Sequence, residues 1–425
     1  MTQDSGLCSN LKSIRNRLGM SQQHLANLTG VTRQTISGVE SGQYAPSVTI
    51  ALRLAKVLGC QVEELFWIEQ DFPEVDAVLA PPVPGGRQLR VSLARVAGQL
   101  IAYPLVGKDA FRTEMIPADG EAVTVSNPVT QKSCNGEALA EGFSGISKLS
   151  FLERVPTQSP LALASPEKAE SESQIGTNKI RVRLLDDVDK LYNTVVIAGC
   201  APVISLWARA SERWHPQLRV NYTLANSMAA LHHLGRGEVH VAGMHLYDSQ
   251  TGKYNVPFVQ EVLAGKAAVL ITLGVWEEGI LVSPGNPMRI KTVSDLVSRE
   301  ATIVNRELGS GCRMLLEREL KQKQIPFQAV KGFDYVAYNH QDAAQAVVSG
   351  VADAGISTAA IAAIFGLEFI PLHQSRYDLV ILKEYLEEEP VRQLLGTLEH
   401  RLVHSQLKVL GGYDTSKTGE VVATI

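Results

Sequence analysis

The sequence is poor in cysteine and has no arrangement of cysteines that would build a disulfide framework or a zinc site. Five cysteines are spread over 425 residues, and no two of them form a CxxC pair. They are Cys8, Cys60, Cys134, Cys200 and Cys312. An odd, dispersed set is typical of reduced thiols in a cytoplasmic chain. The sequence therefore assigns no metal site and no cofactor.

Long apolar runs and a strong excess of either charge are also missing. The first twenty residues have no apolar core of the signal-peptide type, and the longest apolar run, near 267–275, is too short to cross a bilayer. We therefore expect a soluble, cytoplasmic protein with no membrane partner. The net charge of -4 argues against a nonspecific nucleic-acid coat protein but leaves room for a small DNA-binding domain. The length suggests two or three domains.

Residues 10–66 show helical spacing with start and stop signals in order. Ser21, Thr32 and Ser47 are candidate N-caps, and Gly30 is a natural helix end. The spacing predicts four helices followed by a short fifth one in "VEELFWI". The side chains expected to face inward include Leu25, Leu28, Ile36 and Val39.

Three further segments follow. Prolines and paired glycines predict a linker over 71–87, and period-2 alternation with glycine turns predicts a small β-rich segment within 88–180, with a mobile loop near 165–179. From about 190, strands alternate with helices, which favours parallel sheets with crossovers. We expect residues 1–70 to be all-α and 181–425 to form two α/β lobes. Lobe 1 would comprise about 190–266 and 385–425, lobe 2 about 285–365, and two extended apolar segments would cross between them.

The helical segment carries the ordered motif "SQQHLANLTGVTRQTISGVESGQYAPS", which resembles the Cro/phage-repressor type (XRE family) of helix-turn-helix domain over residues 10–66. The resemblance implies that the third helix enters the major groove of double-stranded DNA and that Gln22 lies near a phosphate. Arg and Gln side chains can recognise guanine and adenine by paired hydrogen bonds. The DNA-contacting residues that it implies are Gln22, Thr32, Arg33, Gln34, Thr35 and Ser37. Because residues 1–66 have only six basic against four acidic side chains, we expect a homodimer that reads two half-sites.

The segment from about 190 to 420 resembles the type II periplasmic-binding-protein fold, and more narrowly the cytoplasmic regulators related to molybdate- and tungstate-binding proteins. The stretches "VAGMHLYDSQTGKYNVPFV", "GILVSPGNP", "IVNRELGSGCR", "VVSGVADAGIS" and "RYDLVILK" carry this resemblance. It implies a two-lobed cleft that closes around a small ligand.

The expected ligand site lies where strands end and helices begin. Free backbone amides at helix starts favour an anion, and hydroxyls and a cation would complete the site. The residues predicted to bind the ligand are Cys200, Asn226, Ser227, Ser310, Gly311, Arg313, Asn339, Thr358 and Tyr377. The "AGCAP" stretch lacks the hydroxyl that many oxyanion-binding relatives have after the glycine, so another small anion or a polar metabolite is an alternative to molybdate or tungstate. His240 and His245 fit core or rim positions better than metal ligation.

The favoured hypothesis is a one-component transcriptional regulator whose cleft binds a small anion and so changes operator binding. Two alternatives stay open. The cleft could be degenerate and serve only as a scaffold for dimerisation or partner docking. An enzyme acting on a small anionic substrate, with Asp353, His340 and Cys312 as its catalytic group, is less favoured because their spacing matches no nucleophile elbow, no HExxH motif and no glycine-rich dinucleotide loop.

Overall fold

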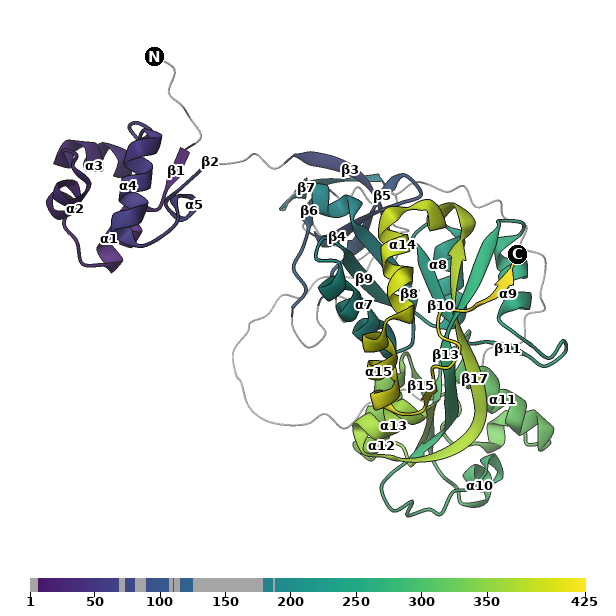
Figure 1. Cartoon of the computed structure of the whole chain (residues 1–425). Coiled ribbons are helices and arrows are strands. Elements are labelled where there is room, and N and C mark those ends of the chain that lie inside the picture. The colour runs from purple at the N-terminus through teal and green to yellow at the C-terminus, as the bar shows by residue number, and fades with distance from the viewer. Residues whose placement is uncertain are drawn as a thin grey trace, which may run out of the picture. The chain divides into compact units, whose positions relative to one another are not determined.

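The computed structural model divides into two compact units, Met1–Glu74 and Val75–Ile425 (Figure 1). The structure describes residues 7–68, 73–80, 89–106, 110, 115–124, 179–185 and 188–425. Most of the expected linker 71–87, nearly all of the expected mobile loop near 165–179, and Cys134 lie outside the described residues.

The first unit is a bundle of five short helices around an apolar core. The helices are α1 (Leu11–Arg17), α2 (Gln22–Thr29), α3 (Arg33–Glu40), α4 (Val48–Leu58) and α5 (Val62–Leu65). The Ser21, Thr32 and Ser47 side chains accept hydrogen bonds from the backbone amides of His24, Thr35 and Ile50, so all three predicted N-caps are present. Gly30 ends α2 in the left-handed conformation that favours glycine.

Two details of this unit differ from the sequence prediction. The fifth helix stops at Leu65, and "FWI" forms strand β2 (Phe66–Ile68), which pairs antiparallel with β1 (Leu7–Ser9). Aromatic and β-branched residues favour extended backbone once a partner strand is present, and no local pattern shows that partner. Leu28 was predicted to face inward, but half of its side chain is exposed.

The second unit begins with a small closed β-barrel. Its strands are β3 (Glu74–Leu79), β4 (Leu89–Val96), β5 (Gln99–Pro104), β6 (Gly120–Thr124) and β7 (Lys179–Leu184), in the order β3-β5-β4-β6-β7. The described residues between 89 and 124 are rich in strands, whereas 74–79, expected in the linker, forms a strand whose alternate side chains enter the barrel core. Asp119 and Arg219 form an ion pair that joins the barrel to the α/β region.

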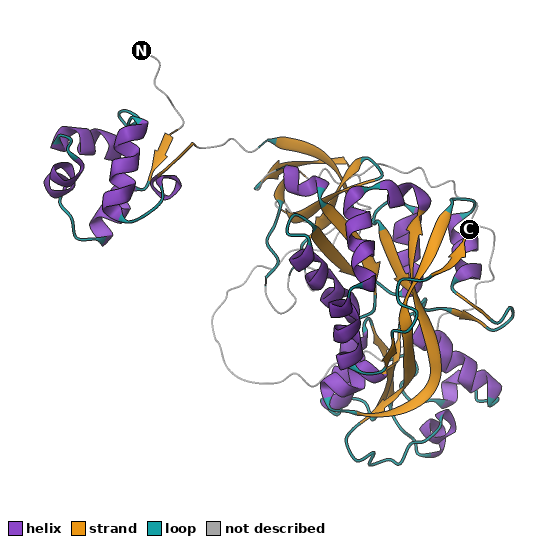
Figure 2. Ribbon diagram, in the orientation of Figure 1, coloured by secondary structure: helices purple, strands orange, loops and turns teal. Residues whose placement is uncertain are grey.

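The rest of the second unit is a ten-stranded sheet flanked by helices (Figure 2). Lobe 1 contains three parallel strands in the order β10-β8-β9. Its elements are α6 (Asp189–Tyr192), β8 (Thr194–Gly199), α7 (Val203–Trp214), β9 (Arg219–Leu224), α8 (Ser227–Gly235), β10 (Val241–Met244), β11 (Tyr247–Asp248), β12 (Lys253–Tyr254) and α9 (Val256–Leu263).

Lobe 2 repeats the alternation with the parallel strands β15-β14-β16. Its elements are α10 (Val293–Ser298), β14 (Ile303–Arg306), α11 (Gly311–Gln322), η2 (Phe327–Ala329), β15 (Val336–Ala337), α12 (His340–Val348), β16 (Ala354–Thr358) and α13 (Ala359–Phe365). Each lobe has an apolar core of its own, as expected for strands that are covered by helices on both faces.

Two fifteen-residue strands run through both lobes. They are β13 (Ala268–Val282) and β17 (Glu368–Leu382), which pair antiparallel along most of their length. In lobe 1, β17 pairs with β10, and in lobe 2, β13 pairs with β16. The two predicted crossing segments are therefore confirmed, and their middle residues lie where the lobes meet.

The C-terminal region packs back on lobe 1. The helical stretch at 389–410 is interrupted at 397–399, where the buried Thr397 hydroxyl bonds Trp207 and Ser211. The elements are η3 (Lys383–Glu387), α14 (Glu389–Gly396), η4 (Thr397–Glu399), α15 (Arg401–Leu410), β18 (Tyr413–Asp414) and β19 (Val421–Thr424). Both last strands pair with β13.

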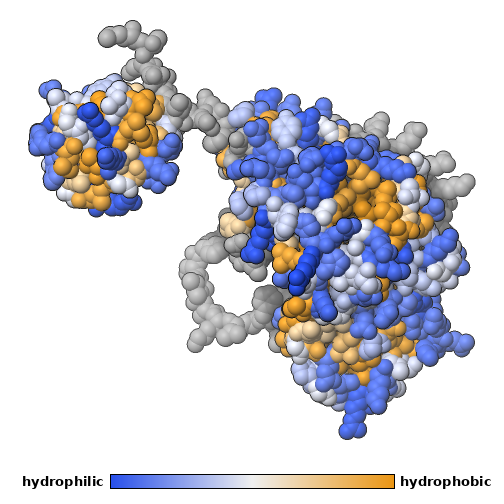
Figure 3. Space-filling view, viewed as in Figure 1, coloured by the Kyte–Doolittle hydropathy of each residue, from blue (hydrophilic) through white to orange (hydrophobic). Residues whose placement is uncertain are grey.

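Hydrophilic side chains cover most of the face of the second unit that is seen in Figure 3. None of the helices in the described ranges has the length and apolar character that a bilayer span requires.

Candidate functional site

The first candidate site is the exposed face of the α2–turn–α3 motif. Arg33, Gln34 and Ser37 are exposed on α3, whereas Ile36 and Val39 on its opposite face are buried in the helical core. The structure thus brings three of the six predicted DNA-contacting side chains to one accessible helix surface. This is the arrangement that a groove-reading helix needs.

The remaining predicted DNA contacts already have partners within the unit. The Thr32 and Thr35 hydroxyls lie 2.8 Å apart, and Thr32 also caps α3. The Gln22 amide donates to Glu40 over 2.7 Å, and Glu40 in turn pairs with Arg15 at 2.5 Å. Burial would raise the pKa of Glu40, but the hydrogen bonds from Arg15 and Gln22 outweigh it and hold the pKa below its usual value. This network fixes the start of α2 against the end of α3.

The second candidate site lies between the lobes, where helix starts from both sides meet. The Asn226 side chain, which caps α8 in lobe 1, donates to the Leu308 carbonyl in lobe 2 over 3.2 Å. The amide of Met228 donates to the Gly309 carbonyl over 3.3 Å. Gly311 opens α11 directly against His245, leaving no room for a Cβ. The lobes are therefore in contact, and the residues between them are enclosed.

A buried His–Glu pair lies at the centre of this contact. Nδ1 of His245 is 2.8 Å from Oε1 of Glu278, and both side chains are almost fully buried. Burial alone would lower the pKa of His245, but Glu278 raises it to about 10. The pKa of Glu278 stays below its usual value for the reciprocal reason, with Ser375 and Cys312 also donating to the carboxylate.

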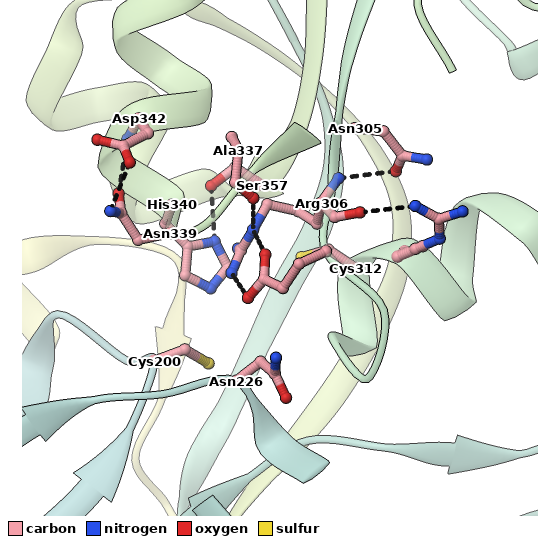
Figure 4. Close-up of polar contacts among 12 residues, drawn as sticks. Cys200, Asn226, Asn305, Arg306, Cys312, Ala337, Asn339, His340, Asp342 and Ser357 are labelled. Atoms are coloured by element: carbon pink, nitrogen blue, oxygen red, sulfur yellow. Dashed lines mark hydrogen bonds and ion pairs between the residues drawn. The ribbon is translucent and has the colours of Figure 1, made fainter. Parts of the chain in front are cut away.

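A buried arginine faces the same region. Arg306, at the end of β14, is 1% exposed and makes two hydrogen bonds to Glu307, of 2.9 and 3.0 Å. Its Nη1 has no partner among the described residues. Figure 4 shows Arg306 and His340 on the lobe 2 side facing Cys200 and Asn226 on the lobe 1 side. Burial and the Arg306 charge hold the pKa of His340 well below its usual value.

The predicted ligand cation, Arg313, is occupied elsewhere. Its Nε pairs with Glu317 at 2.8 Å, its Nη1 donates to the Arg306 carbonyl, and its guanidinium lies over the Phe333 ring. Arg313 is the third residue of α11, and its partner Glu317 lies four residues later on the same face of the helix. Among the buried side chains that the structure describes, Arg306 is a cation with an unused donor, and the sequence prediction missed it. Its position at the end of a buried strand was the available signal.

Most of the other predicted ligand residues hold the loops together. The Asn339 side chain makes two bonds to Asp342, and Ser227 accepts from the His245 amide. The Tyr377 hydroxyl accepts from the Cys200 amide over 3.3 Å, with burial raising its pKa well above the usual value. These side chains shape the strand ends and already have partners.

By contrast, several buried polar atoms near the lobe contact have none. The hydroxyls of Ser310 and Thr358 stand at the N-caps of α11 and α13 but make no capping bond. Among the described residues, the buried side-chain atoms without a hydrogen-bond partner are Ser310 Oγ, Thr358 Oγ1, Arg306 Nη1, Trp276 Nε1, His340 Nε2, Tyr413 OH and His245 Nδ1, the last of which has only its ion-pair contact with Glu278. Buried polar groups without a partner are rare in proteins, so this group points to a ligand.

Strand pairing and ring contacts show that several of these residues lie close to the His245–Glu278 pair. Thr358 pairs with Glu278 across β16 and β13, and Tyr413 pairs with Trp276 across β18 and β13. The ring of Trp276 also packs against those of His245 and His340, with centroids 4.7 and 5.7 Å away. A pocket of about 330 Å³ reaches the His245–Glu278 pair from outside, along Gly311 and Ser375.

The residues of the enzyme alternative are not brought together. Asp353 is exposed and precedes β16, where its carboxylate accepts from the Thr302 amide. His340 and Cys312 are buried near the opposite end of that strand, where Ser357 and Glu278 bond them. The hypothesis that these three residues form a catalytic group is therefore wrong.

Comparisons with known proteins give a match for each of the two units. A helix-turn-helix family model matches residues 11–65, and a PBP superfamily domain model matches residues 208–399. The HTH-type transcriptional regulator YgzD of Bacillus subtilis is 41% identical over 61 residues, which are 14% of this chain and 92% of that protein.

Two further similarities concern the second unit. The protein YvgK of Bacillus subtilis is 35% identical over 197 residues, which are 46% of this chain; the chain spans 63% of the length of YvgK. An ABC-type phosphate transport receptor from Vibrio cholerae is 14% identical, with a TM-score of 0.36 over 52% of this chain and 98% of the receptor. The match to YgzD and the helix-turn-helix family model show that the chain belongs to the HTH-type regulators. A PBP superfamily domain, which has two α/β lobes, follows the DNA-binding helices in the sequence.

Proposed function

We propose that the protein is a ligand-responsive transcriptional regulator whose inter-lobe site binds a small oxyanion. The exposed side chains of α3 would read an operator as part of a homodimer, and occupancy of the cleft would change the affinity for that operator. A cytoplasmic location belongs to this proposal, because the helix-turn-helix unit has to reach DNA.

The observation that best supports an anionic ligand is the set of buried hydrogen-bond donors without partners among the described residues. Arg306 Nη1 and Trp276 Nε1 can only donate, and the hydroxyls of Ser310 and Thr358 stand at helix starts where backbone amides favour negative charge. A tetrahedral oxyanion accepts several hydrogen bonds at once, so it would satisfy such a set. Molybdate, tungstate, phosphate and sulfate all have this chemistry, and molybdate or tungstate stays the first candidate from the sequence resemblance.

The test is a thermal-denaturation series on the full chain with molybdate, tungstate, phosphate and sulfate, with chloride as the control. At 100 times its Kd, a ligand that binds only the folded protein stabilises it by about 2.7 kcal/mol. We expect one of the four oxyanions to raise the unfolding temperature at submillimolar concentration. If none does, the anion proposal is wrong.

A variant pair makes the test specific. Ser310→Ala with Thr358→Val removes two hydroxyls that make no bond in the structure, so the variant should fold at least as well as the parent. We expect it to bind the anion at least about tenfold more weakly, since hydrogen bonds to charged groups contribute about 1.5–3 kcal/mol each. Ser349→Ala, which removes a hydroxyl at the far end of α12, is the matched control.

A further inference from the structure

The inter-lobe site also contains a group of side chains that suits a cation. The ligand atoms of Cys200, His245 and His340 all lie within 4.8 Å of one another, and all three residues are buried. Cys200 follows β8 and His245 follows β10 in lobe 1, whereas His340 opens α12 in lobe 2. The Cys200 sulfur is a poor hydrogen-bond donor, so it contributes little to an anion site.

The outer nitrogens of both histidines face polar side chains. Nδ1 of His340 lies 2.9 Å from the Ser357 hydroxyl in a hydrogen bond, and Nδ1 of His245 lies 2.8 Å from the Glu278 carboxylate in an ion pair that does not have hydrogen-bond geometry. Histidines that bind a metal through one nitrogen almost always bond a carboxylate or another polar group through the second. Here His340 makes that second bond, and His245 has a carboxylate beside its second nitrogen, so both Nε2 atoms are left for the interior.

The inner atoms have the separation that a shared metal requires. Sγ of Cys200 lies 3.3 Å from Nε2 of His245. Metal–sulfur and metal–nitrogen bonds of about 2.3 and 2.0 Å at a tetrahedral angle separate the two ligand atoms by about 3.5 Å. The third atom, Nε2 of His340, is fully buried and has no hydrogen-bond partner among the described residues. It lies within 4.8 Å of the other two ligand atoms, so a small shift of this side chain completes the set.

We propose that Cys200 Sγ, His245 Nε2 and His340 Nε2 form a three-ligand site for a borderline transition-metal cation of the Zn²⁺ class. One thiolate and two imidazoles select zinc, cobalt, nickel or copper over magnesium and calcium, which prefer oxygen ligands. Because the ligands come from both lobes, the metal links them in the closed arrangement.

The surrounding charges are compatible with a dication. Glu278 and the Cys200 thiolate supply two negative charges beside the metal, and Glu307 pairs with the nearby Arg306. Metal binding displaces any proton held by the ligand nitrogens and sulfur. The inference goes beyond the proposed function, since it requires neither an anion nor DNA.

The test is a cobalt titration of the full chain after dialysis against a chelator. We expect one Co²⁺ per chain to produce a sulfur-to-cobalt charge-transfer band together with the visible bands of tetrahedral coordination, and Zn²⁺ to abolish both. If the parent protein gives no charge-transfer band, the proposal is wrong, and this result depends on no variant.

Variants identify the ligands. Cys200→Ser should lose the charge-transfer band, and Ser357→Ala, which leaves all three ligands in place, should weaken Co²⁺ binding about 10–100-fold. The matched control is Cys312→Ser, because Cys312 is a second buried cysteine near the site, bonded to Glu278, and is not one of the three ligands. A band that persists in Cys200→Ser and disappears in Cys312→Ser would overturn the assignment.

The metal and the anion are tested separately by repeating the oxyanion series on the chelator-treated protein. Stabilisation by an oxyanion without any cobalt band would leave the anion proposal standing and overturn the metal site. A cobalt band without stabilisation by any oxyanion, in the metal-free or zinc-loaded protein, would do the reverse.

Discussion

At the scale of single residues, the site depends on charged groups that are buried but only partly satisfied. Arg306 uses two of its nitrogens on Glu307 and keeps Nη1 free, so the same side chain holds lobe 2 together and presents a donor. Breaking a buried pair of this kind by removing one partner costs about 3–5 kcal/mol. A conservative change is therefore needed to separate the two roles.

We predict that Arg306→Lys keeps the fold but weakens anion binding at least about tenfold. Lysine keeps the charge, but its single ammonium group cannot bond Glu307 at two points and also reach a ligand. Calorimetric titration with the oxyanion that stabilises the parent measures the loss. Arg313→Lys is the matched control, and an equal loss in that variant would show that Arg306 has no special role.

The same reasoning predicts an acid-sensitive contact away from the cleft. Burial would raise the pKa of Glu238, but hydrogen bonds from His233 and Arg236 lower it to about 2. Because the folded-state pKa lies below the unfolded value, the stability that Glu238 contributes is present above about pH 4.5. It is lost as the pH falls toward 2.

We therefore expect Glu238→Gln to lower the free energy of unfolding by about 1–2 kcal/mol at pH 7, and by clearly less at pH 3. Denaturant unfolding of parent and variant at both pH values measures this. Glu261→Gln, at an exposed position of α9, should change little at either pH. A Glu238→Gln effect that is equally large at pH 3 would contradict the assignment.

At the scale of helices and strands, close backbone approaches decide where the side chains point. A Cβ at Gly199 or Gly243 would collide with the Tyr377 hydroxyl, which lies against the ends of β8 and β10. The glycines thus admit the tyrosine that bonds the Cys200 amide. The loop that carries Cys200 is positioned by this contact between three strands.

This contact predicts a rescue experiment. Gly243→Ala should destabilise the protein by about 1–3 kcal/mol through overpacking, and adding Tyr377→Phe should recover part of that loss because the clashing oxygen is removed. Thermal unfolding of the two single variants and the double variant measures the coupling. Strict additivity of the two effects would mean that the tyrosine and glycine do not interact as described.

A second prediction at this scale separates folding from recognition in α3. Thr32→Ala removes an N-cap bond and should cost about 1 kcal/mol of stability. Arg33→Ala removes an exposed side chain, so stability should change by less than about 0.5 kcal/mol while the affinity for a selected DNA site falls. If Arg33→Ala leaves DNA affinity unchanged, Arg33 does not read the operator.

The same scale explains what the sequence could and could not predict. Caps such as Ser21 and Ser47 and the two crossing strands follow from local patterns, since each signal lies within the element that it specifies. The pairing of Phe66–Ile68 with Leu7–Ser9 and the choice of Arg306 over Arg313 depend on tertiary contacts. The meeting of Cys200, His245 and His340 requires three separate strand ends from two lobes, and no spacing in the chain encodes it.

At the scale of the whole molecule, the proposed function links ligand binding in the second unit to DNA binding by the first unit in one thermodynamic cycle. A ligand can shift DNA binding only by binding the two states of the protein with different affinities, and DNA must then shift ligand affinity by the same factor. In the proposed function, enclosure of the buried donors between two lobes would give a ligand a preference for the closed arrangement. The claim that most needs a measurement is that an occupied cleft changes the affinity of the helix-turn-helix unit for DNA.

The most direct measurement is the affinity of the full chain for a DNA site selected from random sequence, by fluorescence anisotropy, with and without a saturating concentration of the stabilising oxyanion. The account predicts that Kd for this DNA changes about fivefold or more, and that Arg306→Lys abolishes the change. An unchanged Kd in protein that thermal unfolding shows to be anion-bound would contradict it.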